Sequence, residues 1–140
     1  MILLDTDTVS LFHAGHPHVT ARLAKIEATE TVGTTIITYA EIMRARFEFL
    51  LKASDGTQLR RAQAGLDSSQ ALLNDLPTID VDEAASREFD RLRQDKKLRK
   101  LGRADLLIAC IALVNRATLV TRNLRHFRQV PGLRVENWAD

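Results

Sequence analysis

The chain is predicted to adopt an α/β fold built on a mostly parallel sheet of about five strands. Two observations lead to this prediction: short apolar or β-branched runs alternate with longer stretches of helical spacing, and no internal repeat interrupts the alternation. The length of 140 residues suits one domain over residues 1–140, and 45% hydrophobic residues are enough for one core. The single cysteine, Cys110, lies in an apolar run and is interpreted as a buried residue, which excludes a disulfide framework and a cysteine-rich zinc site.

Five short segments have the composition of strands. The first is an apolar run that stops at a carboxylate, the second is rich in β-branched residues, and the third follows Pro77. The fourth mixes apolar and β-branched residues, and the fifth follows Pro131 and Gly132 as a short edge strand. In chain order the predicted strands are Ile2–Leu4, Thr31–Thr38, Thr78–Val81, Ala117–Thr121 and Leu133–Val135.

The stretches between these strands carry apolar residues at helical spacing. Gly15 and Pro17 break the first stretch into two helices, acids open the helix at Asp82, and the last long helix is so apolar that it should be buried. Ser54–Thr57 and Lys96–Gly102 are predicted to be flexible loops. The predicted helices are Thr8–Ala14, Val19–Ala28, Tyr39–Lys52, Gln58–Leu76, Asp82–Gln94, Arg103–Asn115 and the short Leu124–Phe127.

Positive charge is concentrated in one part of the chain. The net charge is only +2, but residues 91–103 hold seven Lys or Arg side chains against the single acid Asp95, which leaves +6 locally. Such a run could steer a polyanion to the surface, and it could equally be a solvated helix end with its loop.

We expect the protein in the cytoplasm. No basic region precedes the apolar run Ile2–Leu4, so no signal peptide is predicted. No apolar run approaches the roughly 20 residues that a membrane-spanning helix needs.

Three carboxylates stand at the ends of predicted strands or the starts of predicted helices. Asp5 follows the first strand, Glu41 follows the second within the first turn of a helix, and Asp105 opens the apolar helix. Each alone is explained as a helix cap or a partner of the helix dipole. In a parallel sheet, however, ligands bind outside the carboxyl ends of the strands, so all three acids could converge on one edge.

Converging carboxylates need a proton or a cation between them, and Mg²⁺ prefers oxygen ligands. Asn123 follows the fourth strand, either as a cap for the next helix or as a neutral fourth member of the cluster. Thr6 and Thr121 could hydrogen-bond the same acids or the substrate, with Asp7 as a nearby supporting residue. No spacing typical of zinc ligands occurs, and we interpret the neighbouring histidines, His13, His16 and His18, as surface residues of a turn.

At these residues the sequence resembles PIN-domain proteins, and in particular the VapC toxins of bacterial toxin–antitoxin pairs. Each matching motif is weak, but their order and spacing agree along essentially the whole chain. The motifs are Leu3-Leu4-Asp5-Thr6-Asp7, Thr38-Tyr39-Ala40-Glu41-Ile42, Ala104-Asp105-Leu106-Leu107-Ile108-Ala109, Leu119-Val120-Thr121-Arg122-Asn123-Leu124-Arg125-His126-Phe127 and the tail from Val130 to Trp138.

The resemblance implies a three-layer α/β/α domain with a catalytic set of Asp5, Glu41, Asp105 and Asn123. It implies an endoribonuclease that uses Mg²⁺, or Mn²⁺, held by the three acids. It also implies a homodimer that a small VapB-like antitoxin neutralises by inserting a segment near the site. Many relatives carry a fourth acid where this chain has Asn123, which weakens the metal-site prediction without overturning it.

Three basic residues were selected as contacts for the RNA backbone. Arg103 precedes Asp105 by two positions, and Lys100 and Arg122 lie close to it or to Asn123 in the sequence.

Two other functions fit parts of the sequence. Asp5 and Asp7 match the aspartate-nucleophile motif of haloacid-dehalogenase-type phosphatases, although no acidic pair follows a late strand. Alternatively, Asn123 could mark a catalytically weak PIN fold that only binds RNA or protein.

One helix carries apolar residues on more than one face. They are expected to be mostly core, with an excess left for a dimer or antitoxin groove. The residues are Phe47, Phe49, Leu50 and Leu51.

Overall fold

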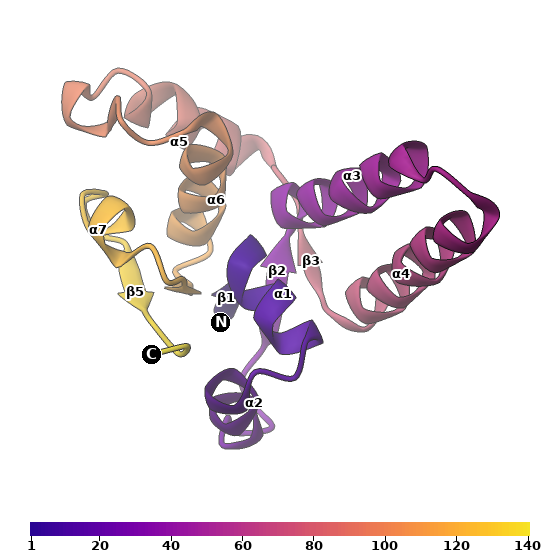
Figure 1. Ribbon diagram of the computed structural model, residues 1–140. Coiled ribbons are helices and arrows are strands. Elements are labelled where there is room, and N and C mark those ends of the chain that lie inside the picture. Colours follow the sequence, from indigo (N-terminus) through magenta and orange to yellow (C-terminus); the bar gives the residue numbers. More distant parts are fainter.

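Five parallel strands form a single sheet in the order β3-β2-β1-β4-β5 (Figure 1). The computed structural model describes residues 1–140. The predicted α/β fold with a parallel sheet is confirmed, and β5 is an edge strand as predicted. The strands are β1 (Ile2–Leu4), β2 (Val32–Thr35), β3 (Thr78–Ile79), β4 (Thr118–Val120) and β5 (Arg134–Glu136).

Helices lie on both faces of the sheet, so the molecule has three layers (Figure 1). No helix combines the length and apolar character that crossing a membrane requires. The helices are α1 (Thr6–His13), α2 (Pro17–Ala24), α3 (Ile36–Lys52), α4 (Gly56–Asp75), α5 (Glu83–Leu92), α6 (Arg103–Val114) and α7 (Leu124–Phe127), with a 3₁₀ turn, η1, at Lys96–Leu98.

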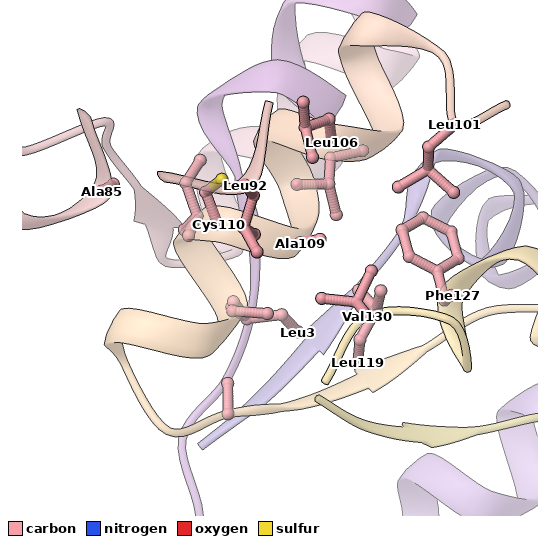
Figure 2. Close-up of a cluster of buried hydrophobic side chains, with 14 of the residues drawn as sticks. Leu3, Ala85, Leu92, Leu101, Leu106, Ala109, Cys110, Leu119, Phe127 and Val130 are labelled. Atoms are coloured by element: carbon pink, nitrogen blue, oxygen red, sulfur yellow. The ribbon is translucent and has the colours of Figure 1, made fainter. Parts of the chain in front are cut away.

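Adjacent residues of the central strand β1 point into two separate cores. Leu3 packs with α5, α6 and α7 in one core, and Figure 2 shows it beside the residues of α6 and β4. Leu4 packs with residues of α1, α2 and α4 and with the C-terminal Trp138 in the other. Alternation along a strand produces this division, because successive side chains leave opposite faces of a sheet.

Small side chains let the apolar helix α6 approach the sheet closely. Ala109 and Ala112 are fully buried in the first core, and their neighbour Cys110 is buried as well. Burial raises the pKa of the Cys110 thiol to about 11, so the thiol stays protonated and unreactive at neutral pH.

The second strand is shorter than predicted. The sequence Thr31–Thr38 was predicted as one strand, but β2 ends at Thr35, and α3 begins at Ile36. Thr35 is the N-cap of α3: its side-chain oxygen accepts a hydrogen bond from the backbone N–H of Thr38 at 3.2 Å. A capping threonine thus overrides the β-branched composition, and Glu41 lies in the second turn of α3 instead of the first.

The apolar residues near the end of α3 are more exposed than expected. The prediction that they are mostly core is wrong, because Phe47, Phe49 and Leu51 are 52%, 64% and 68% exposed. The two helices α3 and α4 lie side by side and project from the sheet (Figure 1), so most of their length has no third layer to cover it. Arg46 Nε donates a 2.8 Å hydrogen bond to Ser69 Oγ and connects the pair.

A glycine at the junction of β2 and β3 has no room for a side chain. A Cβ atom at Gly33 would lie 2.4 Å from the carbonyl oxygen of Pro77, which accepts the backbone N–H of Thr34 at 2.9 Å. We expect Gly33→Ala to lower the free energy of unfolding by about 1–3 kcal/mol, the usual cost of overpacking. Urea unfolding measures it, with Gly56→Ala as control because nothing lies within 4 Å there; equal midpoints would contradict the prediction.

Candidate active site

Asp5 is a buried carboxylate that also caps a helix. It is the N-cap of α1, and its Oδ1 accepts a 2.9 Å hydrogen bond from the backbone N–H of Thr8. The hydroxyls of Thr121 and Thr8 lie near it and, with the Thr8 N–H, act to lower its pKa. Burial raises the pKa of Asp5 and outweighs these effects. The capping role and the catalytic role are therefore compatible at this position.

Asp105 experiences the charges of the other acids. It lies in the first turn of α6 and is partly buried, and none of the protein's hydrogen bonds involves its carboxylate. Its pKa is raised first by burial and then by the charges of Glu41 and Asp5, with a smaller effect from Asp7. Three segments distant in sequence thus place Asp5, Glu41 and Asp105 near enough for the charges of the first two to act on the third.

Glu41 is held by a hydroxyl from the neighbouring helix. Thr6 Oγ1 donates to Glu41 Oε1 at 2.7 Å and lies 3.1 Å from Thr38 Oγ1. This links the first turn of α1 to α3. Thr6 therefore occupies the supporting position predicted for it, and it fixes the direction of the most exposed of the three acids.

Asn123 binds a histidine that the sequence analysis did not select. Its backbone N–H donates to Thr121 Oγ1 at 3.0 Å, and its side-chain nitrogen lies 2.8 Å from His126 Nδ1. His126 also faces the acids, since its charge lowers the pKa of Asp105. Asn123 and His126 are three positions apart at the start of α7, and this spacing is the sequence signal that could have identified His126.

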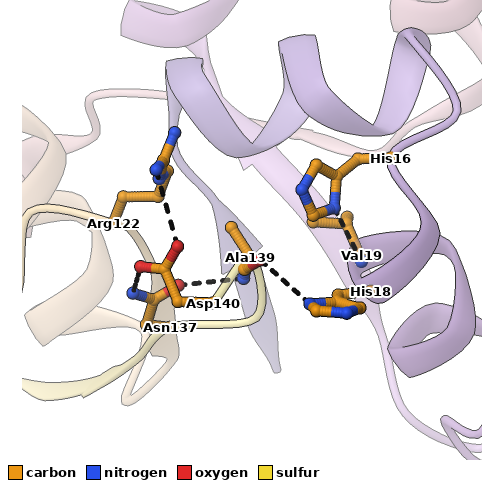
Figure 3. A network of polar contacts seen from close by, with 7 residues as sticks. All are labelled: His16, His18, Val19, Arg122, Asn137, Ala139 and Asp140. Atoms are coloured by element: carbon orange, nitrogen blue, oxygen red, sulfur yellow. Dashed lines mark hydrogen bonds and ion pairs between the residues drawn. The ribbon is translucent and has the colours of Figure 1, made fainter.

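The three residues selected for RNA contact do not gather at one place. The Arg103 guanidinium lies 5.2 Å from the centre of the Phe89 ring. Arg122 faces the C-terminal residue Asp140, at 3.5 Å between nitrogen and carboxylate oxygen (Figure 3). Lys100 lines a separate basic pocket together with His126.

Of the three histidines predicted to lie in a turn, only His16 does; His13 ends α1 and His18 lies in the first turn of α2. His16 caps α2 by accepting from the Val19 N–H at 3.5 Å, and His18 Nδ1 lies 3.1 Å from the carbonyl oxygen of Ala139 (Figure 3). The third, His13, lies 2.8 Å from Ser68 on α4.

The acidic cluster suits a hard divalent cation by its chemistry. All its donors are carboxylate oxygens, and burial raises the pKa of Asp5 and Asp105, with the charges of Glu41 and Asp5 adding to the effect at Asp105; a bound cation would favour the charged carboxylates. As the side chains stand, no three of the His, Cys, Asp and Glu groups are close enough to hold an ion. The Glu41 carboxylate is directed to Thr6 instead, so it has to turn to join the others.

A largely apolar groove leads away from the acids. It begins at Thr6 and Glu41 and runs between α1, α3 and α4 to the exposed Phe49, with a volume of about 460 Å³. Seven of its 13 lining residues are hydrophobic, including Ile42 and Leu72. A groove of this character accommodates an amphipathic segment of another chain.

A parallel sheet with an acidic cluster at its carboxyl edge defines a class of α/β proteins with an oxygen-rich, cation-attracting site. Within this class, the PIN domain model matches residues 2–133, and the chain belongs to the PIN domain family. Over 68 residues it is 38% identical to Ribonuclease VapC2 of Rickettsia felis, a match that spans 47% of this chain and 51% of the relative. Over 140 residues it is 24% identical to Ribonuclease VapC1 of Haemophilus influenzae, covering 98% and 97%.

Solved structures agree with this assignment. The chain superposes with a TM-score of 0.79 on a chain of the VapBC2 complex from Rickettsia felis bound to a promoter DNA fragment, at 27% identity and with 99% of both chains covered. The resemblance to PIN-domain proteins is thereby confirmed, and the phosphatase interpretation of Asp5 and Asp7 has no support from the comparisons.

Charge repulsion among the acids should be measurable in the metal-free protein. A carboxyl whose pKa is raised by folding stabilises the fold fully below its unfolded pKa, and the contribution is lost as the pH rises through the folded pKa. At pH 7 with a chelator, Asp105→Asn should therefore raise the unfolding temperature, because it removes a partly buried charge that lies near Glu41 and Asp5.

The difference between Asp105→Asn and the wild type should shrink as the pH falls toward 3, where both side chains are neutral. Thermal unfolding followed by circular dichroism measures both values. Asp80→Asn, at an exposed position between β3 and α5, is the control and should have little effect. A destabilised Asp105→Asn protein at pH 7 would contradict the repulsion.

Proposed function

We propose that this protein is the toxin of a type II toxin–antitoxin system and cleaves RNA phosphodiester bonds with the help of Mg²⁺. The observation that carries the proposal is the position of three acids at the carboxyl edge of the sheet: Asp5 directly follows β1, and Asp105 lies close enough to Glu41 and Asp5 for their charges to raise its pKa. Membership of the PIN domain family and the similarity to ribonucleases named VapC support it.

In this proposal the three carboxylates hold one or two Mg²⁺ ions, with Mn²⁺ as an alternative. When bound, the ion supplies positive charge that stabilises the charge developing on the phosphate oxygens. Asn123 contributes no charge, so the site carries about one negative charge fewer than a four-acid site, and a second ion should bind more weakly than the first.

The chain's own residues position these groups. The backbone N–H of Thr8 fixes the Asp5 carboxylate, and the Thr6 hydroxyl fixes Glu41. Asp105 has no hydrogen-bond partner and is free to bind an ion or take a proton, for which its raised pKa suits it. His126 anchors the Asn123 amide beside the acids.

The groove beside Glu41 is proposed as the binding surface for a VapB-like antitoxin. Apolar side chains of the antitoxin would contact the groove between α1, α3 and α4. An Arg at the end of that segment would reach the acids, where a guanidinium replaces the charge of the metal. The exposed Phe47 and Leu51 on α3 are available for the same complex or for a homodimer.

Removing either core carboxylate should slow RNA cleavage strongly. We expect Asp5→Asn and Asp105→Asn to lower the cleavage rate about 100- to 1,000-fold, the scale of losing one charge-stabilising group from an active site. Total RNA incubated with purified protein and Mg²⁺, followed by gel electrophoresis, measures the rate. A chelator should stop wild-type cleavage, and added Mg²⁺ should restore it.

Asp80→Asn is the matched control, because it removes an exposed carboxylate outside the cluster. If both core variants keep the wild-type rate, the acidic-site proposal is wrong.

One observation favours a second function. The fourth position of the cluster is a neutral amide already bound to His126, as in the interpretation of a PIN fold that only binds RNA or protein. Tight RNA or antitoxin binding by the wild type, with no cleavage under any divalent metal, would select that function.

A further inference from the structure

A second pocket, beside the acidic cluster, is lined entirely by polar and charged side chains. It has a volume of about 710 Å³ and no hydrophobic residue in its lining. Five of the seven lining residues are cations, and none is an acid. The lining comprises Lys96, Lys97, Arg99, Lys100, Arg125, His126 and Gln129.

The two segments that form this basic pocket are anchored to the same core. Leu98 and Leu101 alternate with the cations of residues 96–100 and are buried, so they hold that segment against the protein. On the other side, Phe127 and Val130 anchor α7 and the turn after it, and Figure 2 shows Leu101 directed at Phe127. The cations therefore project from a fixed platform and not from a free loop.

The cations of the basic pocket have no acidic partners. None of the five takes part in an ion pair, and the nearby Asp95 accepts from the backbone N–H of Lys97 as the cap of η1. By contrast, Arg91 and Arg93 of the same basic stretch pair with Glu88 and Asp90 on α5. Folding thus neutralises the first two cations of the basic stretch and leaves the four at residues 96–100 without acidic partners.

The basic pocket is continuous with the acidic cluster through one residue. His126 lines the pocket, lies 2.8 Å from the Asn123 amide, and lowers the pKa of Asp105. The chain also runs from Lys100 through Arg103 into the first turn of α6, where Asp105 lies. A polyanion in the pocket would reach the acids within a short distance.

We propose that the basic pocket binds the phosphate backbone of the RNA substrate on one side of the bond that is cut, a step that rests on the proposed ribonuclease function. Unpaired cations around a pocket without apolar lining match a run of phosphates, and they do not match an apolar peptide. Recognition by charge alone is independent of base sequence, so this pocket supplies affinity and register.

RNA affinity tests the proposal without relying on cleavage. Labelled single-stranded RNA is titrated with Asp105→Asn protein in the presence of a chelator, and binding is followed by fluorescence anisotropy. The pocket variant carries Lys97→Gln, Lys100→Gln and Arg125→Gln together in the same background. Loss of three phosphate contacts should reduce the slope of log K against log salt by about 2 and the affinity about 100-fold at about 0.1 M salt.

A control with the same charge change separates the pocket from net charge. The control carries Lys25→Gln, Lys52→Gln and Arg61→Gln, which are exposed and have no ion pairs; they lie at the C-cap of α2 and on α3 and α4, away from the pocket. It should change affinity by no more than about twofold, because exposed charges beyond a Debye length are largely screened. Equal RNA affinity of the two triple variants would overturn the proposal. This holds also if the pocket variant has lost affinity for the antitoxin, because the pocket would then bind protein and not RNA.

Neutral linkages in the RNA locate the contact. A single methylphosphonate linkage, which carries no charge, is moved one position at a time along the RNA. It should weaken binding to the protein with an intact pocket at a few consecutive positions. At those same positions it should have little effect on binding to the pocket variant. Additive losses at every position would overturn the proposal. Because the readout is binding, a protein that binds RNA this way but does not cut it would refute the proposed function and leave the pocket assignment standing.

Discussion

Burial of Leu3 and Leu4 on opposite faces of β1 is the packing constraint on which the rest of the structure depends. Both side chains are fully buried, and each contributes about 1.5–3 kcal/mol relative to an exposed position. Because β1 lies between β2 and β4 in parallel register, these two residues fix the two cores and the direction of the strand. Asp5 comes next in the chain and is thereby placed at the carboxyl edge between two neighbouring strands.

The positions of the acids follow from the pattern of apolar residues along the chain and from the parallel order of the strands, which is why the sequence could predict them. An apolar run that stops at a carboxylate indicates a buried strand with an acid at its end, and parallel strands bring such ends together. Asp105 was equally predictable, since an almost wholly apolar helix must be buried, and its first turn must lie close to the sheet. The end of β2 was not predictable in this way, because the helix cap formed by Thr35 ends the strand within a stretch whose composition favours strand.

Side-chain partners depend on distances between segments that no local pattern encodes. Arg122 looked like an RNA contact from its place beside Asn123, but the C-terminal Asp140 lies next to it in the fold. The composition of the basic stretch before α6 does not show which of its cations are neutralised. Arg91 and Arg93 are neutralised because the turns of α5 place Glu88 and Asp90 beside them. The exposure of Phe49 likewise depends on how far the α3–α4 pair extends beyond the sheet.

An acidic site that acts on a polyanion faces an electrostatic conflict, because the carboxylates needed to hold a cation also repel phosphate. At an effective dielectric constant of 20, two unit charges about 4 Å apart interact by about 4 kcal/mol. The fold separates the two demands in space: the acids gather at the edge of the sheet, and uncompensated cations gather beside α7. Asn123 and His126 lie at the boundary between them. In the proposed function, a neutral amide at that boundary removes repulsion on the side where the RNA backbone would enter, while the charge of Asp5, Glu41 and Asp105 would remain to attract an ion.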